Sequence, residues 1–405
     1  MSANGFRAAG FPWRLYCGRN VLEENLKEAV VRAGAKRAFV ICSRSITRRT
    51  DCVTRIAATL GDLYAGVFDE VENDATYASV SAAKAAAVAA GADLLIAVGG
   101  GSVIMAARGV AIFMGEPGDP FEIMTQYPEG RPAYSPRLMA AKPPIINVPT
   151  TPNSAMNRAG TALKNPDLDQ RMEYFDPKTR PHSIFLDEGA LLATPAELIR
   201  STATTIFASV VAAKGQLESN PLIAGDDEQA FRLTYRAYQR LPDEPRNGAL
   251  LIDIAVAAFL RNRAEDDGMS RLLRGGGFSG NYAVSTALHI RYPRVGQGES
   301  TSAVHGAKIR LSETIDLPVA RHVAEALEVW RDGMKSRDAA LAVAERLEQL
   351  YARAGMPTRL RQLDIPREDF PTLAAETVKN FNANAGLRSR DAQIADALRL
   401  LEAAY

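Results

Sequence analysis

The run Gly99-Gly100-Gly101-Ser102 is the segment whose residue types are best suited to holding a ligand. It directly follows a short apolar stretch, Leu94 to Val98, and a helical pattern opens at Val103. Glycines let the backbone turn tightly and approach a ligand, and the free N–H groups at the start of a helix attract phosphate. A plain strand-to-helix turn would need one glycine rather than three in succession. The turn is therefore predicted to bind a pyrophosphate.

A second run supplies hydroxyl groups for the same kind of ligand. Thr150, Thr151 and Ser154 follow another apolar stretch, Pro144 to Val148, and their oxygens suit phosphate and ribose groups. The usual GxGxxG fingerprint of dinucleotide-binding domains is absent from the chain. We therefore expect a Rossmann-like sheet that binds a nucleotide without the standard Rossmann motif.

Both runs lie in a region where helical and strand patterns alternate. Helices are predicted for residues 20–34 and 79–90, and buried strands for residues 38–42, 94–98 and 144–148. This alternation predicts a parallel sheet with helices on both faces. Ligands of such sheets bind beyond the carboxyl ends of the strands, where the glycine and threonine runs lie.

The second half of the chain has a different pattern. From about Pro195 strand signals end and long amphipathic helices are predicted, for example residues 251–263, 337–354 and 392–404. Residues 115–142, rich in Pro and Gly, are expected to form an irregular insertion. The sequence thus predicts an α/β nucleotide-binding domain, residues 1–193, and an all-helical domain, residues 194–405.

Composition narrows the class of partner. The chain has 405 residues and a formal net charge of +1, so its overall charge gives no attraction to nucleic acid or to anionic membranes. It has no apolar stretch long enough to span a bilayer and no signal-peptide pattern at its start, so we expect a cytoplasmic protein. Its three cysteines have no metal-binding spacing and are expected to be reduced. A small molecule is the expected partner.

Taken together, these motifs resemble the iron-containing alcohol dehydrogenase family, which belongs with dehydroquinate synthase, glycerol dehydrogenase and maleylacetate reductase. The resemblance covers nearly the whole chain. The matching segments are Gly99–Ser102 with Arg108 (family GGGSxxDxAK), Pro149-Thr150-Thr151 (PTT), Asp176-Pro177 through Asp187 (a strand-hairpin and acidic residue) and His305-Gly306 (the last metal-ligand motif). The resemblance implies a dehydroquinate synthase-like fold, NAD(P) as cofactor, hydride transfer in an interdomain cleft, and a homodimer or larger assembly.

The chain departs from the family at the metal ligands. The family's Asp and His ligands lie one helical turn apart in a motif like TGMDALxHA, which we align with residues 204–212. Apolar residues then occupy the ligand positions, namely Phe207, Val211 and, for the next His, Ala283. A catalytic metal needs about three protein ligands, and His305 alone remains. We therefore expect no iron or zinc there, and a vacated space lined by Phe207 and Val211 that accepts a bulkier, more apolar substrate.

Without a metal ion, a side chain has to polarise or protonate the substrate carbonyl. In the segments that the resemblance places at the cleft, the candidates are His305, His289 and Tyr282. Histidine suits neutral pH, and His305 keeps the family position. His305 is therefore the expected general acid.

Basic residues bear on the substrate and on the cofactor. Ser43-Arg44 follow the strand of residues 38–42, where an acidic residue would select NADH, so this pair permits NADPH without excluding NADH. Arg171 aligns with the family's cofactor-contacting Lys. If they face the cleft, the arginines of one segment favour an acidic substrate; these are Arg271, Arg274, Arg291 and Arg294.

Three classes of function remain open from the sequence. The leading interpretation is a metal-independent, NAD(P)-dependent alcohol dehydrogenase or carbonyl reductase that acts on a small oxidised substrate such as an oxo acid. The second is a non-redox lyase or cyclase of the same superfamily, against which the missing metal ligands count. The third is a non-catalytic or regulatory nucleotide-binding homologue.

Overall fold

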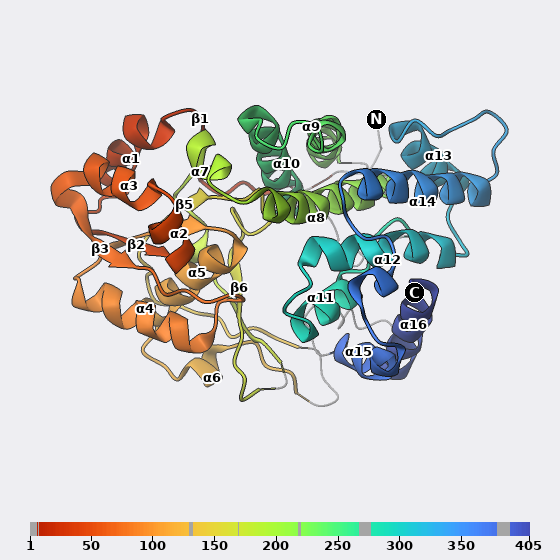
Figure 1. Ribbon diagram of the computed structural model, residues 1–405. Helices are drawn as coiled ribbons and strands as arrows, with labels where there is room; N and C mark the ends of the chain where they lie inside the picture. The colour runs from red at the N-terminus through yellow and green to blue at the C-terminus, as the bar shows by residue number, and fades with distance from the viewer. Residues whose placement is uncertain are drawn as a thin grey trace. The chain divides into compact units, whose positions relative to one another are not determined.

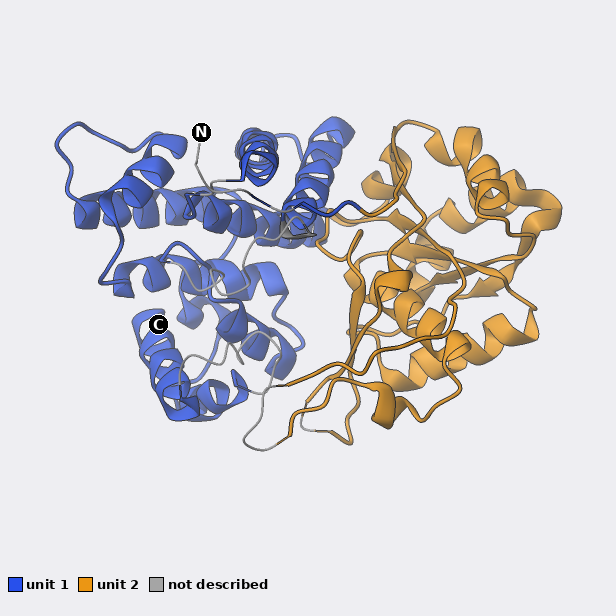
Figure 2. Ribbon diagram, turned by 180° about the vertical axis from the view of Figure 1, so that it is seen from behind, with its two compact units in different colours: residues 1–10, 196–405 blue, residues 11–195 orange. Residues whose placement is uncertain are grey.

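The computed structural model describes residues 6, 8–128, 133–168, 170–217, 220–266, 277–378 and 389–405. The chain divides into two compact units, coloured separately in Figure 2. Residues 11–195 form one, which we call the α/β unit. Residues 196–405, together with the described residues before Phe11, form the other, which we call the helical unit. Each is described by itself.

A six-stranded parallel sheet forms the centre of the α/β unit (Figure 1). From one edge to the other its strands are β1 (Leu15–Gly18), β8 (Ser183–Asp187), β5 (Ile145–Pro149), β4 (Leu94–Gly99), β2 (Ala38–Cys42) and β3 (Tyr64–Phe68). The central strands β2, β4 and β5 are buried along their whole length. Strands covered on both faces have continuous apolar sequences, which is why these three were predicted from the sequence.

Helices cover both faces of the sheet, as predicted. Apolar residues of α1 (Val21–Arg32) and α3 (Cys52–Leu60) share a core with alternate residues of β2 and β4, such as Val40 and Ile96. The opposite face is covered by α5 (Gly101–Gly115), which packs against α4 (Tyr77–Ala89). The remaining elements of the unit are α2 (Arg44–Arg49), η1 (Gly61–Leu63), α6 (Pro120–Ile123), η2 (Pro177–Thr179), α7 (Glu188–Leu192) and an antiparallel hairpin of β6 (Gly160–Leu163) and β7 (Met172–Phe175).

A buried carboxylate ties the end of the sheet to its helices. Asp187, at the end of β8, accepts two hydrogen bonds from the Arg55 guanidinium, at 3.0 and 3.2 Å, and caps α7 by accepting from the Ala190 N–H at 3.0 Å. Arg55 also donates to Glu23 of α1. A buried charge is stable only when paired in this way, so Asp187 fixes β8, α3 and α1 together.

The described residues of the helical unit contain no β-strand, which confirms the prediction of an all-helical second half. Its helices are α8 (Ala196–Lys214), α9 (Pro221–Arg240), α10 (Gly248–Asp266), α11 (Tyr282–Arg291), α12 (Gln297–Leu311), α13 (Leu317–Ala326), α14 (Ser336–Arg353), η4 (Leu360–Leu363), η5 (Arg367–Asp369), α15 (Phe370–Glu376) and α16 (Arg390–Ala403). α11, α12, α15 and α16 share one apolar core.

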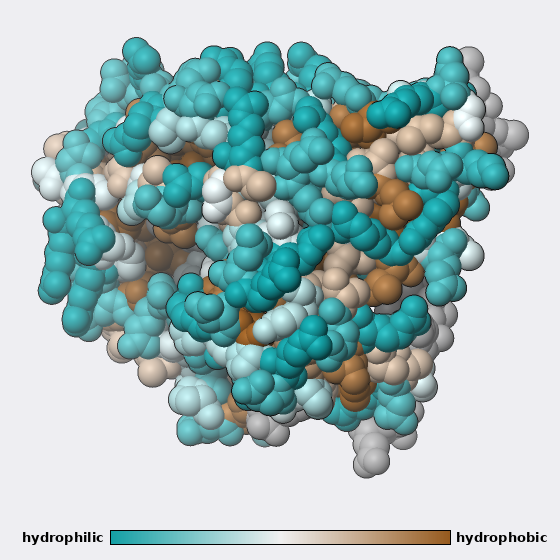
Figure 3. Space-filling model, turned by 45° about the vertical axis from the view of Figure 1, so that its right-hand side comes forward, coloured by the Kyte–Doolittle hydropathy of each residue, from teal (hydrophilic) through white to brown (hydrophobic). Residues whose placement is uncertain are grey.

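No helix in the described parts of the chain is long and apolar enough to cross a membrane. On the face shown in Figure 3, hydrophobic residues appear as scattered patches among hydrophilic ones.

Candidate cofactor-binding site

The strand order reverses direction near the middle of the sheet. The chain runs from β2 outward to β3, then crosses back to form β4 on the other side of β2. β2 and β4 are paired in parallel, with Cys42 opposite Val98, so Ser43 and Gly99 leave the sheet side by side. Such a reversal of direction is the point at which open α/β sheets bind ligands. The predicted ligand-binding runs therefore lie where the fold favours a site.

The glycine turn is shaped for close approach of a ligand. Gly99 ends β4, Gly100 occupies the N-cap position and α5 begins at Gly101, two residues earlier than predicted. A Cβ on Gly99 would lie 2.7 Å from Val103 Cγ2, whereas a Cβ on Gly101 would meet no atom within 4 Å. Among the described residues no side chain caps the helix, which leaves the first backbone N–H groups of α5 available to an anion.

Thr150 and Thr151 lie beside this turn because β5 is the next strand. The Thr150 N–H donates to the Gly99 carbonyl at 3.1 Å, and the Thr150 carbonyl accepts from the Thr194 hydroxyl at 2.7 Å. Thr151 is 2% exposed, its hydroxyl has no hydrogen-bond partner in the described part of the chain, and a Cβ on Gly100 would lie 3.3 Å from its oxygen. An unsatisfied buried hydroxyl costs about 1–3 kcal/mol, so a ligand oxygen here would be stabilising. The residues present fit a phosphate group.

Arg171 is linked to the same turn through a residue that sequence reasoning missed. The Asp74 N–H donates to the Ser102 hydroxyl at 3.1 Å, and Arg171 donates to the Asp74 carboxylate at 3.1 Å. Asp74 and Ala75 both have positive φ angles, 63° and 51°, a strained conformation that is concentrated at functional sites. Nothing in the sequence indicated this strain, because neither residue is a glycine.

Arg108 holds the segment that follows the threonines. It is 1% exposed and donates to the carbonyls of Ala155 and Gly160, while its Nε has no hydrogen-bond partner. Burial, and then the charges of Arg158 and Arg180, lower its pKa to about 9, so it stays charged at neutral pH. Ser154, in contrast, is exposed just before this segment. Arg108 therefore links α5 to the segment after β5 through hydrogen bonds.

Ser43 and Arg44 lie at the end of the neighbouring strand. Ser43 occupies the N-cap position of α2, and its hydroxyl lies 2.9 Å from that of Ser45. Arg44 is exposed and forms an ion pair with Glu70, which follows β3. All of the predicted cofactor-binding residues thus lie in the α/β unit, and those on β2, β4 and β5 are brought together by the strand order.

His305 has an environment that favours a structural role. It is completely buried in α12, where Nδ1 lies 2.7 Å from the Tyr351 hydroxyl and Nε2 lies 2.9 Å from the Phe278 carbonyl. The carbonyl can only accept, so Nε2 carries the proton and Nδ1 accepts from Tyr351. Burial lowers its pKa to about 4. A general acid has to exchange its proton with substrate or water, and both ring nitrogens here are engaged inside the unit.

The other two candidates for catalysis lie on α11. Tyr282 is 52% exposed at the start of the helix. His289 is half-buried in the last turn, and its Nδ1 donates to the Val295 carbonyl at 2.7 Å. Their catalytic roles, like that of His305, stay predictions.

The arginines expected to attract an acidic substrate are in part engaged within the helical unit. Arg291 forms an ion pair with Glu376 at 3.0 Å, and Arg294 donates to the carbonyls of Leu363 and Asp364 at 2.8 and 2.9 Å. Arg271 and Arg274 lie outside the described residues.

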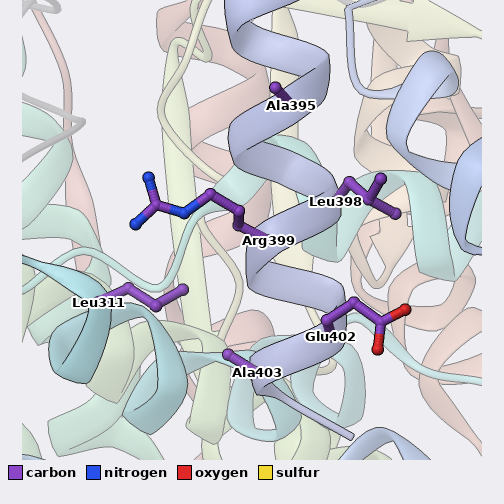
Figure 4. A pocket seen from close by; sticks show the side chains of 6 residues that line it. All are labelled: Leu311, Ala395, Leu398, Arg399, Glu402 and Ala403. Carbon is purple, nitrogen blue, oxygen red and sulfur yellow. The ribbon is translucent and has the colours of Figure 1, made fainter.

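One hollow of about 710 Å³ in the helical unit is unrelated to these residues (Figure 4). It is lined by Leu311, Ala395, Leu398, Arg399, Glu402 and Ala403. Its lining comes from α16 and the end of α12 and includes none of the predicted site residues.

Comparison with known proteins decides the family. Two family models match the chain, "Iron-containing alcohol dehydrogenase" over residues 12–188 and "Fe-containing alcohol dehydrogenase family, C-terminal" over residues 294–405. The chain belongs to the iron-containing alcohol dehydrogenase family. The predicted family is confirmed, and its relatives are oxidoreductases of the alcohol dehydrogenase type.

Relatives extend over nearly the whole chain. The 4-hydroxybutyrate dehydrogenase of Cupriavidus necator is 26% identical over 393 residues, which cover 93% of this chain and 94% of the relative. Maleylacetate reductase 2 of Cupriavidus pinatubonensis is 40% identical over 112 residues, 28% of this chain and 30% of the relative. The solved alcohol dehydrogenase from Oenococcus oeni is 20% identical, with a TM-score of 0.81 over 100% of both chains. The predicted dehydroquinate synthase-like fold is thereby confirmed.

The expectation that Phe207 and Val211 line a vacated metal pocket is wrong. Both are completely buried in α8. The Phe207 ring stacks on Tyr238 with 4.6 Å between centroids and packs edge-on against Tyr351 at 6.0 Å. These side chains belong to the core of the helical unit, which excludes them from contact with a substrate.

Because Phe207 is buried, we align the family motif two residues earlier in the chain. TGMDALxHA then falls on residues 202–210, with Thr202 at its first position, Thr205 at the acidic position and Ser209 at the His position. Thr205 and Ser209 lie one turn apart and are partly exposed, unlike Phe207. Two residues correspond to about 200° around a helix, so the shift moves the motif from the buried face to the open one.

This donor set does not fit the family's metal ion. Neutral hydroxyls at residues 205 and 209 and the methyl group of Ala283 are not the imidazole and carboxylate ligands that iron or zinc needs. Within the described ranges, no group of three or more His, Cys, Asp or Glu side chains is arranged to hold a metal ion.

Gly101→Val should abolish or strongly weaken NAD(P) binding without unfolding the protein. Its side chain would enter the open space in front of α5, where no protein atom lies within 4 Å of the Cβ, and would block a phosphate. Fluorescence titration with NADH and NADPH measures the affinity, and thermal unfolding measures the fold. Gly225→Val, another glycine with open space around its Cβ, is the matched control. Unchanged affinity in Gly101→Val would remove the phosphate site from this turn.

Phe207→Asp and Thr205→Asp should differ sharply in stability. A carboxylate at residue 207 would be buried among aromatic rings, so the loss should reach at least about 3–5 kcal/mol. At the partly exposed residue 205 the loss should stay below about 1 kcal/mol. Urea unfolding measures both. Equal losses would contradict the assignment of residue 205, rather than 207, to the open face.

The buried His305 should make stability depend on pH. Its pKa of about 4 in the folded protein lies below the usual value near 6.5, so the unfolded chain binds a proton that the folded protein does not. The stabilisation is complete above pH ~6.5 and is lost as the pH falls toward 4. Between pH 7 and 5 the wild type should lose roughly 2 kcal/mol more stability than His305→Gln in urea unfolding. An equal loss in both proteins would show that His305 titrates normally.

Proposed function

We propose that this member of the family is an NAD(P)-dependent alcohol dehydrogenase or carbonyl reductase that works without a bound metal ion. The observation that carries the proposal is the uncapped start of α5 next to the unpartnered, buried Thr151 hydroxyl. Backbone N–H groups and a hydroxyl that lack partners among the described residues match the oxygens of a pyrophosphate. When bound, the nicotinamide of the cofactor supplies or accepts the hydride.

In this proposal the α/β unit holds the cofactor along its carboxyl edge. Residues 99–102 bind the pyrophosphate through backbone N–H groups, and Thr151 adds a hydroxyl. Ser43 and Arg44, at the end of the adjacent strand, meet the adenosine ribose. Arg171 orients the turn through Asp74, with which it shares a 3.1 Å ion pair. Ser154, which is exposed on the segment after β5, offers its hydroxyl to the cofactor at the edge of this site.

The proposal that no metal ion is bound rests on the residues at the ligand positions, which are the hydroxyls of residues 205 and 209 and the methyl group of Ala283. Without a metal ion, a protein side chain has to polarise the substrate carbonyl. Tyr282 is the most exposed of the candidate general acids. Hydroxyls at residues 205 and 209 offer neutral donors in place of charged ligands. The substrate in this proposal is a small oxo acid or the corresponding hydroxy acid, since two relatives are named for the carboxylates 4-hydroxybutyrate and maleylacetate.

From the family resemblance we further propose a cytoplasmic homodimer or larger homo-oligomer. The competing interpretations, a non-redox lyase and a non-catalytic nucleotide-binding protein, differ from the proposal in one measurable property. Neither of them would produce net oxidation of NAD(P)H.

Protein purified and dialysed against a chelator should contain far less than one iron or zinc per chain and should still oxidise NADH or NADPH in the presence of small oxo acids. Elemental analysis measures the metal, and absorbance at the reduced nicotinamide band measures turnover. Supplementation with Fe²⁺ or Zn²⁺ is the control and should not raise the rate. Stoichiometric metal retained against dialysis would overturn metal independence, and cofactor binding without turnover would favour the non-catalytic interpretation.

A further inference from the structure

A group of carboxylates lies at the strand end where the cofactor's ribose is proposed to bind. The Val71 N–H donates to the Cys42 carbonyl at 3.2 Å, so the segment after β3 crosses the end of β2. Glu70 of this segment pairs with Arg44, and Asp69 accepts a hydrogen bond from Thr47 at 2.6 Å. From the sequence, only the residues that directly follow β2 were expected at the ribose. The structure adds the acidic residues that follow the neighbouring strand, β3.

Several carboxylates act on the Arg44 guanidinium. Its pKa is raised, first by the hydrogen bond and charge of Glu70 and then by the charges of Asp69 and Glu72. Three carboxylates thus act on one guanidinium. Two further cations, Arg48 and Arg49, lie in the last turn of α2. The Arg44 and Glu70 side chains are 58% and 55% exposed, so both charged groups can be reached by a ligand and their pairing is screened by solvent.

We propose that Glu70 sets the cofactor preference of this enzyme, by occupying Arg44 and presenting negative charge to the ribose, so that NADH is favoured over NADPH. The proposal rests on the proposed function, that NAD(P) binds at this edge of the sheet. An acidic residue at a ribose accepts a hydrogen bond from a 2′-hydroxyl and repels a 2′-phosphate, whereas a free arginine accommodates that phosphate. Ser43 and Arg44 by themselves permit either cofactor, and Glu70 shifts the preference toward NADH.

The test is the ratio of the two cofactor affinities in Glu70→Gln, measured by fluorescence titration with NADH and with NADPH. Glutamine keeps the size of the side chain and removes its charge, which releases Arg44 for the 2′-phosphate. Wild type should bind NADH more tightly, and the substitution should shift the ratio toward NADPH about fivefold, the upper range for one exposed ion pair. The shift should shrink at high salt, because exposed charges are screened.

Two controls distinguish the effect of the Arg44–Glu70 pair from a general effect of removing a negative charge. Glu28→Gln removes the same charge from another exposed ion pair of the α/β unit, with Arg32, and should leave the ratio unchanged. Arg44→Gln combined with Glu70→Gln should lose the gained NADPH affinity, because the released guanidinium is then missing.

The outcomes distinguish this inference from the proposed function. If wild type and Glu70→Gln bind both cofactors with the same ratio, or if wild type prefers NADPH, the role of Glu70 is refuted while the cofactor site stands. If wild type binds neither cofactor, the proposed function is refuted and this inference with it.

Discussion

The parallel pairing of β2, β4 and β5 is the constraint on which the rest of the candidate site depends. Val98 lies opposite both Cys42 and Val148, so three strand ends open at one edge of the sheet. Segments that are about fifty residues apart in the chain therefore meet there. A glycine turn that was not flanked by these neighbours would be an anion site without selectivity, because its backbone donors recognise any phosphate.

Two residues, Arg108 and Asp74, hold the backbone segments around that edge of the sheet in different ways. Arg108 is a buried cation satisfied by carbonyls, and it anchors the segment after β5 to α5. Asp74 is held in a strained conformation between Ser102 and Arg171. No side-chain hydrogen bond to the first N–H groups of α5 is present among the described residues. Rigid surroundings with an uncovered centre are what a preorganised binding site requires.

In the helical unit the residues aligned with the family's metal ligands are two hydroxyls and a methyl group, which do not match the imidazole and carboxylate ligands of iron or zinc. α8 keeps its apolar core face, where Phe207 stacks on Tyr238, and presents Thr205 and Ser209 on the other face. His305 belongs to the core of the helical unit, where its two ring nitrogens are hydrogen-bonded to Tyr351 and to the Phe278 carbonyl.

The sequence by itself determined the family, the central strands and the glycine turn, because each depends on local patterns: continuous apolar runs, helical periodicity and three successive glycines. It did not reveal β1 or β3, whose residues are only partly buried and lack those patterns. Only the tertiary structure decided which face of α8 is open, that His305 is buried, and that Glu70 meets Arg44. Those facts depend on contacts between distant segments, and a rotation of about 200° on a helix, invisible in residue types, exchanges a core position for an exposed one.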